Sequence, residues 1–340
     1  MKTKILAVML ASFPFGIGIC SQYYSILDLG VIGNDSVSAA FAINNYGQAV
    51  GFSDERGFIY TDGAIRSLYP NGNVRRPYGI NDKGEVVGNG QNAFLYSHGI
   101  LNDLGPLDGI RTGATAINNS GQIVGYAGNR AFLYSNGLMN EINLNLDGTT
   151  GGTPYAINNH GEVVGLGIGQ NHAGHAILRH ADGSLFDIDN LLNPLHDPQS
   201  GSRAYGINDL GQVVGYNGNS HAFLYANEAV LDLGTLGGGA SEATGINIHG
   251  QIVGNSYTSN MRIHAFLYSD GVLYDLNTMI DPSLGWELLH AEAINNSGQI
   301  AGYGYNGNGQ MRAFIISTIP EPACLTLAGA CLLIFMKRSR

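Results

Sequence analysis

The feature that most constrains the fold of this chain is a motif that recurs seven times along it. One copy is AINNSGQIVGY, which begins at residue 116. In every copy an isoleucine is followed by asparagine, and glycines stand four and eight residues after the isoleucine. The seven isoleucines are Ile43, Ile80, Ile117, Ile157, Ile207, Ile246 and Ile294. Self-similarity at a regular period indicates a repeat architecture, so we expect an array of copies of one structural unit.

Each unit is predicted to contain four short antiparallel strands. The motif supplies two strands around an Asn/Asp-x-Gly turn, in which glycine takes the positive φ of a tight hairpin. A second hairpin follows, as in AFLYSDGVLYDLN from residue 265. The residue before each isoleucine is Ala or Gly, which indicates crowding by the same strand of a neighbouring copy. The isoleucines are on average about 42 residues apart, and four strands in that length match a propeller blade.

The seventh unit lacks a fourth strand, and this predicts how the array closes. Its third strand, AFIIS at residues 313–317, runs directly into the C-terminal segment, whereas an unpaired strand, SILDLG at residues 25–30, precedes the first unit. We therefore predict an all-β, seven-bladed β-propeller over residues 23–317, with the last blade closed by the N-terminal strand. Closure removes open sheet edges. The alternative is an open β-solenoid, which would need capping ends.

Both ends of the chain have the composition of export signals. Residues 1–20 combine two lysines, an apolar stretch and small residues, as a secretory signal peptide does. Residues 320–340 contain Pro320, Glu321 and Pro322, then an apolar run over residues 323–336 and a basic end. This run is shorter than the roughly 20 residues that a helix needs to cross a bilayer, and the basic end would stay cytoplasmic. A plain membrane anchor is the alternative at either end.

The C-terminal segment resembles the PEP-CTERM sorting signal of Gram-negative bacteria in all three of its parts. That resemblance implies export, a membrane-held intermediate with a transmembrane helix in the tail, and processing by an exosortase. The expected partners during processing are therefore the export machinery and the exosortase. The same resemblance links the protein to cell surfaces and to matrices rich in exopolysaccharide.

The body between the two ends resembles the HAF-repeat family of predicted extracellular bacterial proteins. It contains the HAF triplet at residues 221–223 and 264–266, and the phrases INDLGQVVGY from residue 207, DLGTLGG from residue 232 and DPSLGW from residue 281. Other copies depart from the triplet, with Asn92, Arg130 or Arg312 in place of the histidine. The resemblance implies an extracellular location and a repeat architecture, and it implies no activity.

Composition narrows the range of partners. All three cysteines lie in the terminal segments, and a body of about 300 residues can bury a sufficient core without disulfides. The chain has 16 basic and 26 acidic residues, of which five and one lie in the terminal segments, so the body has 11 and 25 and a net charge of −14. Such a surface repels phosphate backbones, so we do not expect nucleic acid as a partner.

The sequence indicates no cofactor, no metal site and no catalytic centre. His172 and His175 lack further ligands at zinc spacing, and His175 occupies a repeat position where a hydrogen bond to a turn or backbone carbonyl is expected. The Asn/Asp turns offer at most one acid each, fewer than a calcium loop needs. Glu242, Glu292 and Asp281 are acids of the kind that cleave glycosides, but nothing in the sequence brings two of them together.

Recognition is expected on two longer connections, DNLLNPLHDPQSGSRAY from residue 189 and NTMIDPSLGWELLHAE from residue 277. Both join a fourth strand to the next first strand, so in a propeller they emerge on the same face, where loops commonly bind ligands. The candidate binding residues are Trp286, His196 and Tyr205. Trp286 is the single tryptophan and would suit a sugar or a protein partner. The alternative is that Trp286 packs beneath its own loop.

Together these observations predict an exported, non-enzymatic protein of the cell surface or extracellular matrix. It would bind extracellular polysaccharide or surface proteins, or serve as a structural component. A carbohydrate-active enzyme on the same scaffold is the alternative. A third hypothesis is an architectural spacer, which would have no concave pocket on its exposed face.

Overall fold

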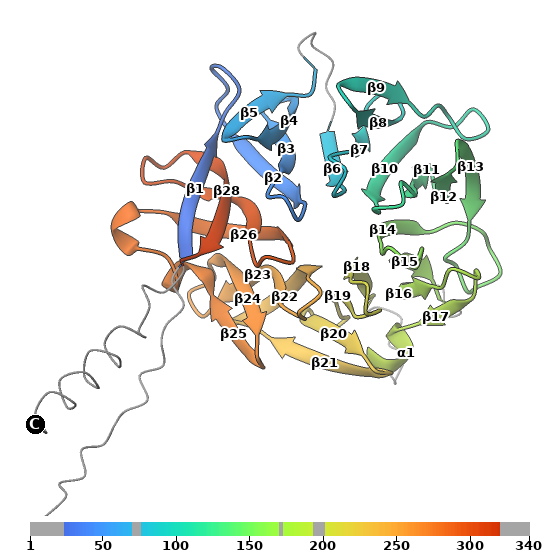
Figure 1. The fold of residues 1–340 in the computed structure, drawn as a ribbon. Helices are drawn as coiled ribbons and strands as arrows, with labels where there is room; N and C mark the ends of the chain where they lie inside the picture. The colour runs from blue at the N-terminus through green and yellow to red at the C-terminus, as the bar shows by residue number, and fades with distance from the viewer. Residues whose placement is uncertain (1–23, 70–75, 170–172, 193–200, 320–340) are drawn as a thin grey trace, which may run out of the picture.

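The computed structural model describes residues 24–69, 76–169, 173–192 and 201–319. In this part of the chain, seven sheets of four antiparallel strands surround a central axis (Figure 1). Apart from strands, the described residues form one short helix, α1 (Asp189–Leu192), and two 3₁₀ turns, η1 (Leu276–Thr278) and η2 (Pro282–Leu284). The prediction of an all-β, seven-bladed propeller is therefore confirmed.

Consecutive strands build each blade from the axis outward. Blades 1 and 2 are β2 (Ser38–Ile43), β3 (Ala49–Ser53), β4 (Arg56–Thr61), β5 (Ala64–Ser67), and β6 (Arg76–Ile80), β7 (Val86–Asn89), β8 (Ala93–Ser97), β9 (Ile100–Asp103). Blades 3 and 4 are β10 (Thr112–Ile117), β11 (Ile123–Ala127), β12 (Arg130–Ser135), β13 (Leu138–Ile142), and β14 (Thr153–Ile157), β15 (Val163–Ile168), β16 (Gly174–Arg179), β17 (Leu185–Asp187).

The remaining blades follow the same order until the last. Blades 5 and 6 are β18 (Arg203–Ile207), β19 (Val213–Tyr216), β20 (Ala222–Ala226), β21 (Ala229–Gly234), and β22 (Gly237–Ile246), β23 (Ile252–Thr258), β24 (Ile263–Ser269), β25 (Val272–Asp275). Blade 7 is β26 (Glu287–Ile294), β27 (Ile300–Tyr305), β28 (Met311–Thr318), and its outer strand is β1 (Tyr24–Gly30). Because every blade runs in the same direction, all connections between blades emerge on one face, which we call the insert face.

The N-terminal strand closes the ring as predicted. β1 pairs antiparallel with β28, from Tyr24 opposite Thr318 to Gly30 opposite Ala313 (Figure 1). Tyr24 is buried against the interface between blades 6 and 7, and Leu29 is buried against the interface between blades 7 and 1. The closing strand therefore joins the last blade to both of its neighbours.

The turn glycines and the small residues behave as the repeat predicts. The seven glycines that close the inner hairpins have φ between 72° and 81°. A Cβ added to Gly79 would lie 3.2 Å from the Ala116 Cα of the next inner strand. A Cβ on Gly245 would likewise lie 3.3 Å from the Ala293 Cα. Small residues therefore precede the isoleucines because the inner strands of adjacent blades touch near the axis.

The hydrophobic core of the described residues is divided into seven clusters, one at each interface between blades. The centre of most clusters is the aromatic residue of the AFLY strand, and these side chains are fully buried. They are Phe58, Phe94, Phe132, Phe223, Phe266 and Phe314, with Ile177 in blade 4. Burial of one such side chain contributes about 2–3 kcal/mol, so the ring is held by evenly distributed contacts between blades.

A closed ring of asparagines joins the inner turns on the face opposite the inserts. Each asparagine after the repeat isoleucine donates a side-chain hydrogen bond of 2.9–3.2 Å to the backbone carbonyl of its counterpart in the next blade. The last of these bonds runs from Asn295 to the carbonyl of Asn44, so the ring of seven closes. All seven side chains are 2–6% exposed. The invariant asparagine is thus a link between blades, in addition to capping its own turn.

We expect the Asn118→Ala variant to be less stable than the wild type by about 3 kcal/mol, because burial leaves its former partners unsatisfied. Asn118 donates to the Gln122 side chain and to the Asn158 carbonyl, and it accepts from the backbone of Ser120 and Gln122. Urea unfolding measures the difference. The exposed Asn102 on β9 provides the control, since Asn102→Ala should change stability by less than about 0.5 kcal/mol. Equal midpoints for both variants would contradict a supporting role for the ring.

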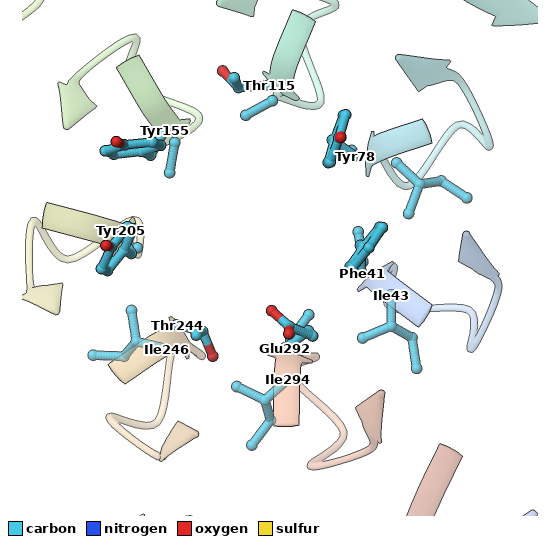
Figure 2. Close-up of a pocket in the computed structure, with 18 of the residues that line it drawn as sticks. Phe41, Ile43, Tyr78, Thr115, Tyr155, Tyr205, Thr244, Ile246, Glu292 and Ile294 are labelled. Atoms are coloured by element: carbon cyan, nitrogen blue, oxygen red, sulfur yellow. The ribbon is translucent and has the colours of Figure 1, made fainter. Parts of the chain in front are cut away.

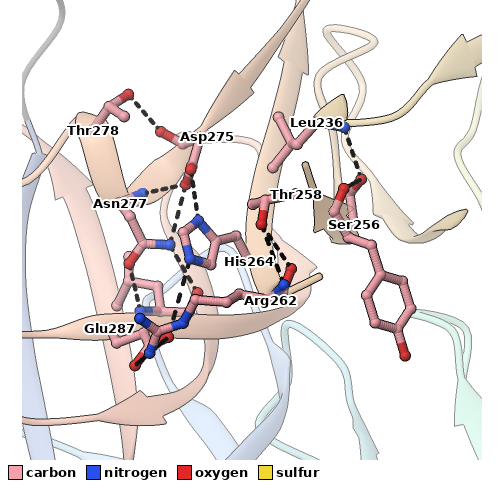
Figure 3. A network of polar contacts seen from close by, with 11 residues as sticks. Leu236, Ser256, Thr258, Arg262, His264, Asp275, Asn277, Thr278 and Glu287 are labelled. Carbon is pink, nitrogen blue, oxygen red and sulfur yellow. Dashed lines mark hydrogen bonds and ion pairs between the residues drawn. The ribbon is translucent and has the colours of Figure 1, made fainter. Parts of the chain in front are cut away.

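The histidine of the HAF triplet has a different partner from the one expected. It pairs with a carboxylate on the fourth strand of its own blade, and not with a turn or a backbone carbonyl. The Nδ1 atom lies 2.6 Å from the Asp275 carboxylate for His264 and 2.9 Å from the Asp232 carboxylate for His221, and His175, at the same repeat position, lies 2.9 Å from the Asp187 carboxylate. Figure 3 shows the His264 pair beside Asn277, whose side chain bonds to the backbone of Leu288. An aspartate near the end of the fourth strand, which in blade 5 is Asp232 of the DLG phrase, is therefore the histidine's structural partner.

Within the described residues no helix has the length and apolar character needed to cross a membrane. The predicted signal peptide at residues 1–20 and the sorting tail at residues 320–340, including Pro320, Glu321 and Pro322, lie outside the described part of the chain.

Candidate functional site

One residue bulges from the inner strand of every blade, next to the axis. In blade 1 the register between β2 and β3 shifts between Ala40 and Ala42, so Phe41 has no partner on the neighbouring strand. A bulge redirects a side chain and is often found beside a functional site. Figure 2 shows these side chains encircling the axis. We call them the bulge ring: Phe41, Tyr78, Thr115, Tyr155, Tyr205, Thr244 and Glu292.

The bulge ring surrounds a central cavity of about 800 Å³ on the insert side of the propeller. The repeat isoleucines form its floor (Figure 2), and on their far side the asparagine turns line a smaller cavity of about 190 Å³. A volume of 300–1,000 Å³ is typical of pockets that hold a small molecule. The larger cavity therefore has the size of a ligand site, and it opens on the face that the sequence predicts to be used for recognition.

Two aromatic pairs form opposite walls of this cavity. The rings of Phe41 and Tyr78 are stacked, with centroids 5.6 Å apart and planes 19° apart. The rings of Tyr155 and Tyr205 lie 5.0 Å apart at 49°. Thr115 separates the pairs on one side of the ring, as Figure 2 shows, and Thr244 and Glu292 separate them on the other. The central cavity thus has aromatic faces on two opposite sides and polar groups between them. Such a cavity suits a ring-shaped ligand with apolar faces, such as a sugar ring.

The two threonines of the bulge ring connect blades. Thr115 Oγ1 donates to the Pro154 carbonyl of the next blade at 2.9 Å, and Thr244 Oγ1 donates to the Ala291 carbonyl at 2.6 Å. Their hydroxyl protons are thus used within the protein. The four aromatic residues and Glu292 are therefore the members of the bulge ring available to a ligand.

Two glutamates meet at the cavity, although the sequence gave no reason to place them together. Glu242 lies on β22 and Glu292 is the bulge residue of β26, and both line the cavity. Burial, and then the negative charge of Glu242, raise the pKa of Glu292 to about 7. The Glu292 side chain is nevertheless 22% exposed, since it borders the cavity. It therefore changes charge near neutral pH.

The surrounding tyrosines keep their protons at neutral pH and can act as hydrogen-bond donors. Burial raises the pKa of Tyr155 and of Tyr205. Burial, followed by the charges of the two glutamates, raises the pKa of Tyr303 to about 12. The Arg203 guanidinium lies 3.4 Å from the Tyr205 hydroxyl, to which it donates. The cavity thus combines apolar faces with hydroxyl groups and acids at its edges.

The structure separates the three binding residues that the sequence suggested. Tyr205 lines the central cavity from β18, and does not lie on the long connection that precedes it. Trp286 is partly buried and packs edge-on against Phe314, with ring centroids 6.1 Å apart. Trp286 thus packs against the core between blades 6 and 7, and its role in binding stays a prediction. His196 lies outside the described residues.

Two further expectations from the sequence concerned Asp281 as an acid and a possible metal site. Asp281 caps the turn η2 by accepting from the Ser283 backbone at 2.9 Å, and it does not line the central cavity. In the described part of the chain, no group of three His, Cys, Asp or Glu side chains is arranged to hold a metal ion.

The sequence analysis missed the bulge ring, although the repeat contains a signal for it. The bulge residue always stands two positions before the repeat isoleucine. Neighbouring positions are nearly constant among the seven copies, whereas this one is Phe, Tyr, Thr or Glu. A position that varies within an otherwise constant repeat is free of the demands of blade packing, which is what a ligand-facing position requires.

Comparison with known proteins identifies the fold. No family model matches the chain, and no curated protein matches it. Among solved structures, the extracellular domain of a putative one-component system from B. thetaiotaomicron is similar, with a TM-score of 0.56 and 13% sequence identity. The match covers 87% of this chain, which spans 40% of that chain's length. A chain of the mitotic checkpoint complex has a TM-score of 0.53 and 11% identity, covering 92% of this chain and 99% of the other. At such identities the similarity establishes a shared propeller fold alone.

Proposed function

We propose that this protein is an exported, non-enzymatic binding protein whose central cavity holds a sugar unit of an extracellular polysaccharide. The observation that carries the proposal is the bulge ring, which places two aromatic pairs on opposite sides of one cavity. Sugar rings stack on aromatic faces, and the hydroxyls of Tyr155 and Tyr205 are placed to bond at the edges. The rigid propeller holds both walls in place before the ligand arrives, which lowers the entropic cost of binding.

Several features support export. The ends of the chain have the pattern of a signal peptide and of a sorting tail processed by an exosortase. The fold is also used by an extracellular domain in B. thetaiotaomicron. We propose that the protein passes through a membrane-held intermediate and acts at the cell surface or in the extracellular matrix.

The proposal is tested by replacing one aromatic wall. Binding to a panel of bacterial polysaccharides and their oligosaccharides should fall at least about fivefold in the Tyr155→Ala/Tyr205→Ala variant, since two stacking contacts of about 0.5–1.5 kcal/mol each are lost. The Tyr46→Ala variant is the control, because Tyr46 is 77% exposed in a turn on the opposite face. Binding that survives the double substitution but is lost in Trp286→Ala would move the site to the longer connections. Unchanged binding in all three variants would exclude both sites.

A carbohydrate-active enzyme is the second candidate function, because Glu242 and Glu292 line one cavity and Glu292 has a pKa of about 7. A carboxylic acid that keeps its proton near neutral pH can act as a general acid in glycoside cleavage. Release of new reducing ends from a bound oligosaccharide, lost in Glu292→Gln, would support this function and overturn the non-enzymatic proposal.

A further inference from the structure

The charged side chains that line the central cavity are acidic, and the nearest basic group, Arg203, lies beside Glu242 and Tyr205 in an adjoining pocket. Among the described residues that line it, Glu242 and Glu292 carry the acidic groups and none is Lys or Arg. His290 also lines the cavity, but burial lowers its pKa, so the imidazole is mainly neutral at pH 7. A cleft lined by charge of one sign concentrates ligands of the opposite sign.

Glu292 lacks a charged partner within the described part of the protein. Its one ion-pair contact there is to His290, whose Nδ1 lies 3.8 Å from the Glu292 Oε1 atom. The His290 ring stacks on Tyr303, with centroids 4.7 Å apart and planes 12° apart, and its lowered pKa leaves it mainly uncharged beside Glu292 at pH 7. The carboxylate therefore faces the cavity without a cation to neutralise it.

The aromatic walls favour a cation at the same place. Glu292 follows Thr244 in the bulge ring and precedes Phe41, so its carboxylate lies between the two aromatic pairs (Figure 2). The negative face of an aromatic ring attracts an ammonium group. Aromatic faces flanking an acid form a common arrangement for binding amines, whereas a neutral sugar would not need the acids.

We propose that the central cavity prefers glycans that carry a protonated amine, with the ammonium group held by Glu292 and Glu242 and the sugar ring held between the aromatic walls. This inference rests on the proposed function, because it defines the class of sugar that the same cavity takes.

The test compares two ligands that differ only in the amine. Calorimetric titration at pH 7 should show that a glucosamine oligosaccharide binds at least tenfold more tightly than its N-acetylated counterpart of equal length. The Glu242→Gln/Glu292→Gln variant should reduce this preference to less than twofold. The matched control is Glu55→Gln, since Glu55 is exposed on a loop of blade 1 and should leave the preference intact.

The outcomes separate the inference from the proposed function. Equal affinity for the two oligosaccharides would overturn the amine preference and keep the glycan site. Binding of the diamine putrescine as tightly as of the amino sugar would keep the acidic amine site and overturn the glycan function. Absence of binding for all three ligands would overturn both.

The pH dependence provides an independent measurement. Putrescine stays protonated below about pH 9, as alkyl amines do, so its affinity should follow the protein alone. Affinity should rise between pH 5.5 and pH 8.5 as Glu292 loses its proton, and Glu292→Gln should flatten the rise. The other titratable groups beside Glu292 are Glu242 on β22, His290 on β26 and Tyr303 on β27, and Tyr205 and Arg203 on β18 lie beside Glu242. A wild-type profile as flat as that of the variant would contradict the role of Glu292.

Discussion

A chain that begins after Gly30, and therefore lacks β1, is expected to lose cooperative folding. β1 supplies the whole outer strand of blade 7 and buries Tyr24 and Leu29 at two interfaces. Burial of these two side chains contributes about 3–6 kcal/mol, and the ladder to β28 adds further hydrogen bonds. Such a loss is comparable to the total stability of about 5–15 kcal/mol that is typical of a domain. It would also leave β28 as an open edge that can pair with another chain.

The measurement is a thermal melt followed by circular dichroism, together with size-exclusion chromatography. The control begins at Tyr24 and keeps the closing strand, so the two proteins differ by seven residues. We expect a single transition for the control, and aggregation or a broad transition for the shorter chain. Addition of a peptide with the sequence of residues 24–30 should restore part of the transition. A shorter chain that melts like the control would show that the ring does not depend on its closing strand.

The Gly215→Ala variant is expected to lose about 4 kcal/mol or more of stability, at the upper end of effects of single substitutions. A Cβ on Gly215 would lie 1.9 Å from the Arg203 carbonyl oxygen on the neighbouring strand, a distance that no local adjustment can accommodate. The same contact recurs in every blade, at 1.9–2.2 Å. This explains why the second glycine of the motif is invariant although it lies within a strand.

The matched control for this prediction is Gly239→Ala. Gly239 also lies within a strand and is exposed, and an added Cβ would meet no atom within 4 Å. We expect its stability to stay within about 0.5 kcal/mol of the wild type. Chemical unfolding of the three proteins measures the difference, and similar midpoints for both variants would contradict the close contact at Gly215.

The same glycine connects stability with the binding site. The Arg203 carbonyl that approaches Gly215 lies two residues before Tyr205, the bulge residue of blade 5. The bulge can form because glycine leaves room for the neighbouring strand. Any Gly215→Ala protein that folds should therefore bind ligand more weakly through Tyr205, even though Gly215 does not line the central cavity.

Much of the architecture could be predicted because it depends on local requirements repeated in every copy. The tight turns need glycine at positive φ, as at Gly47 and Gly84. The alternating strands need Val or Phe at buried positions, and the isolated strand at residues 25–30 needs a partner. Because the same pattern occurs seven times, the number of blades and the closing strand could be predicted from the sequence.

Residue roles that depend on contacts between different strands or blades could not be predicted in the same way. The partner of His264 is Asp275, eleven residues later, and the partner of Asn295 is the carbonyl of Asn44, 251 residues earlier. Trp286 was selected for its residue type, but the direction of its side chain depends on the position of Phe314. Such partners are set by packing in three dimensions, which a single sequence does not display.

The sequence by itself determined the unit of this protein, the number of units and the strand that closes them, because hairpin turns and strand patterns are short-range properties of the chain. The tertiary structure alone decided where a ligand can bind. The residues that line the central cavity come from all seven blades, and the first and last members of the bulge ring, Phe41 and Glu292, are 251 positions apart in sequence. They meet at the axis only after the ring has closed. The pairing of Glu242 with Glu292 and the raised pKa of Glu292 follow from that closure, since both depend on burial beside residues of other blades.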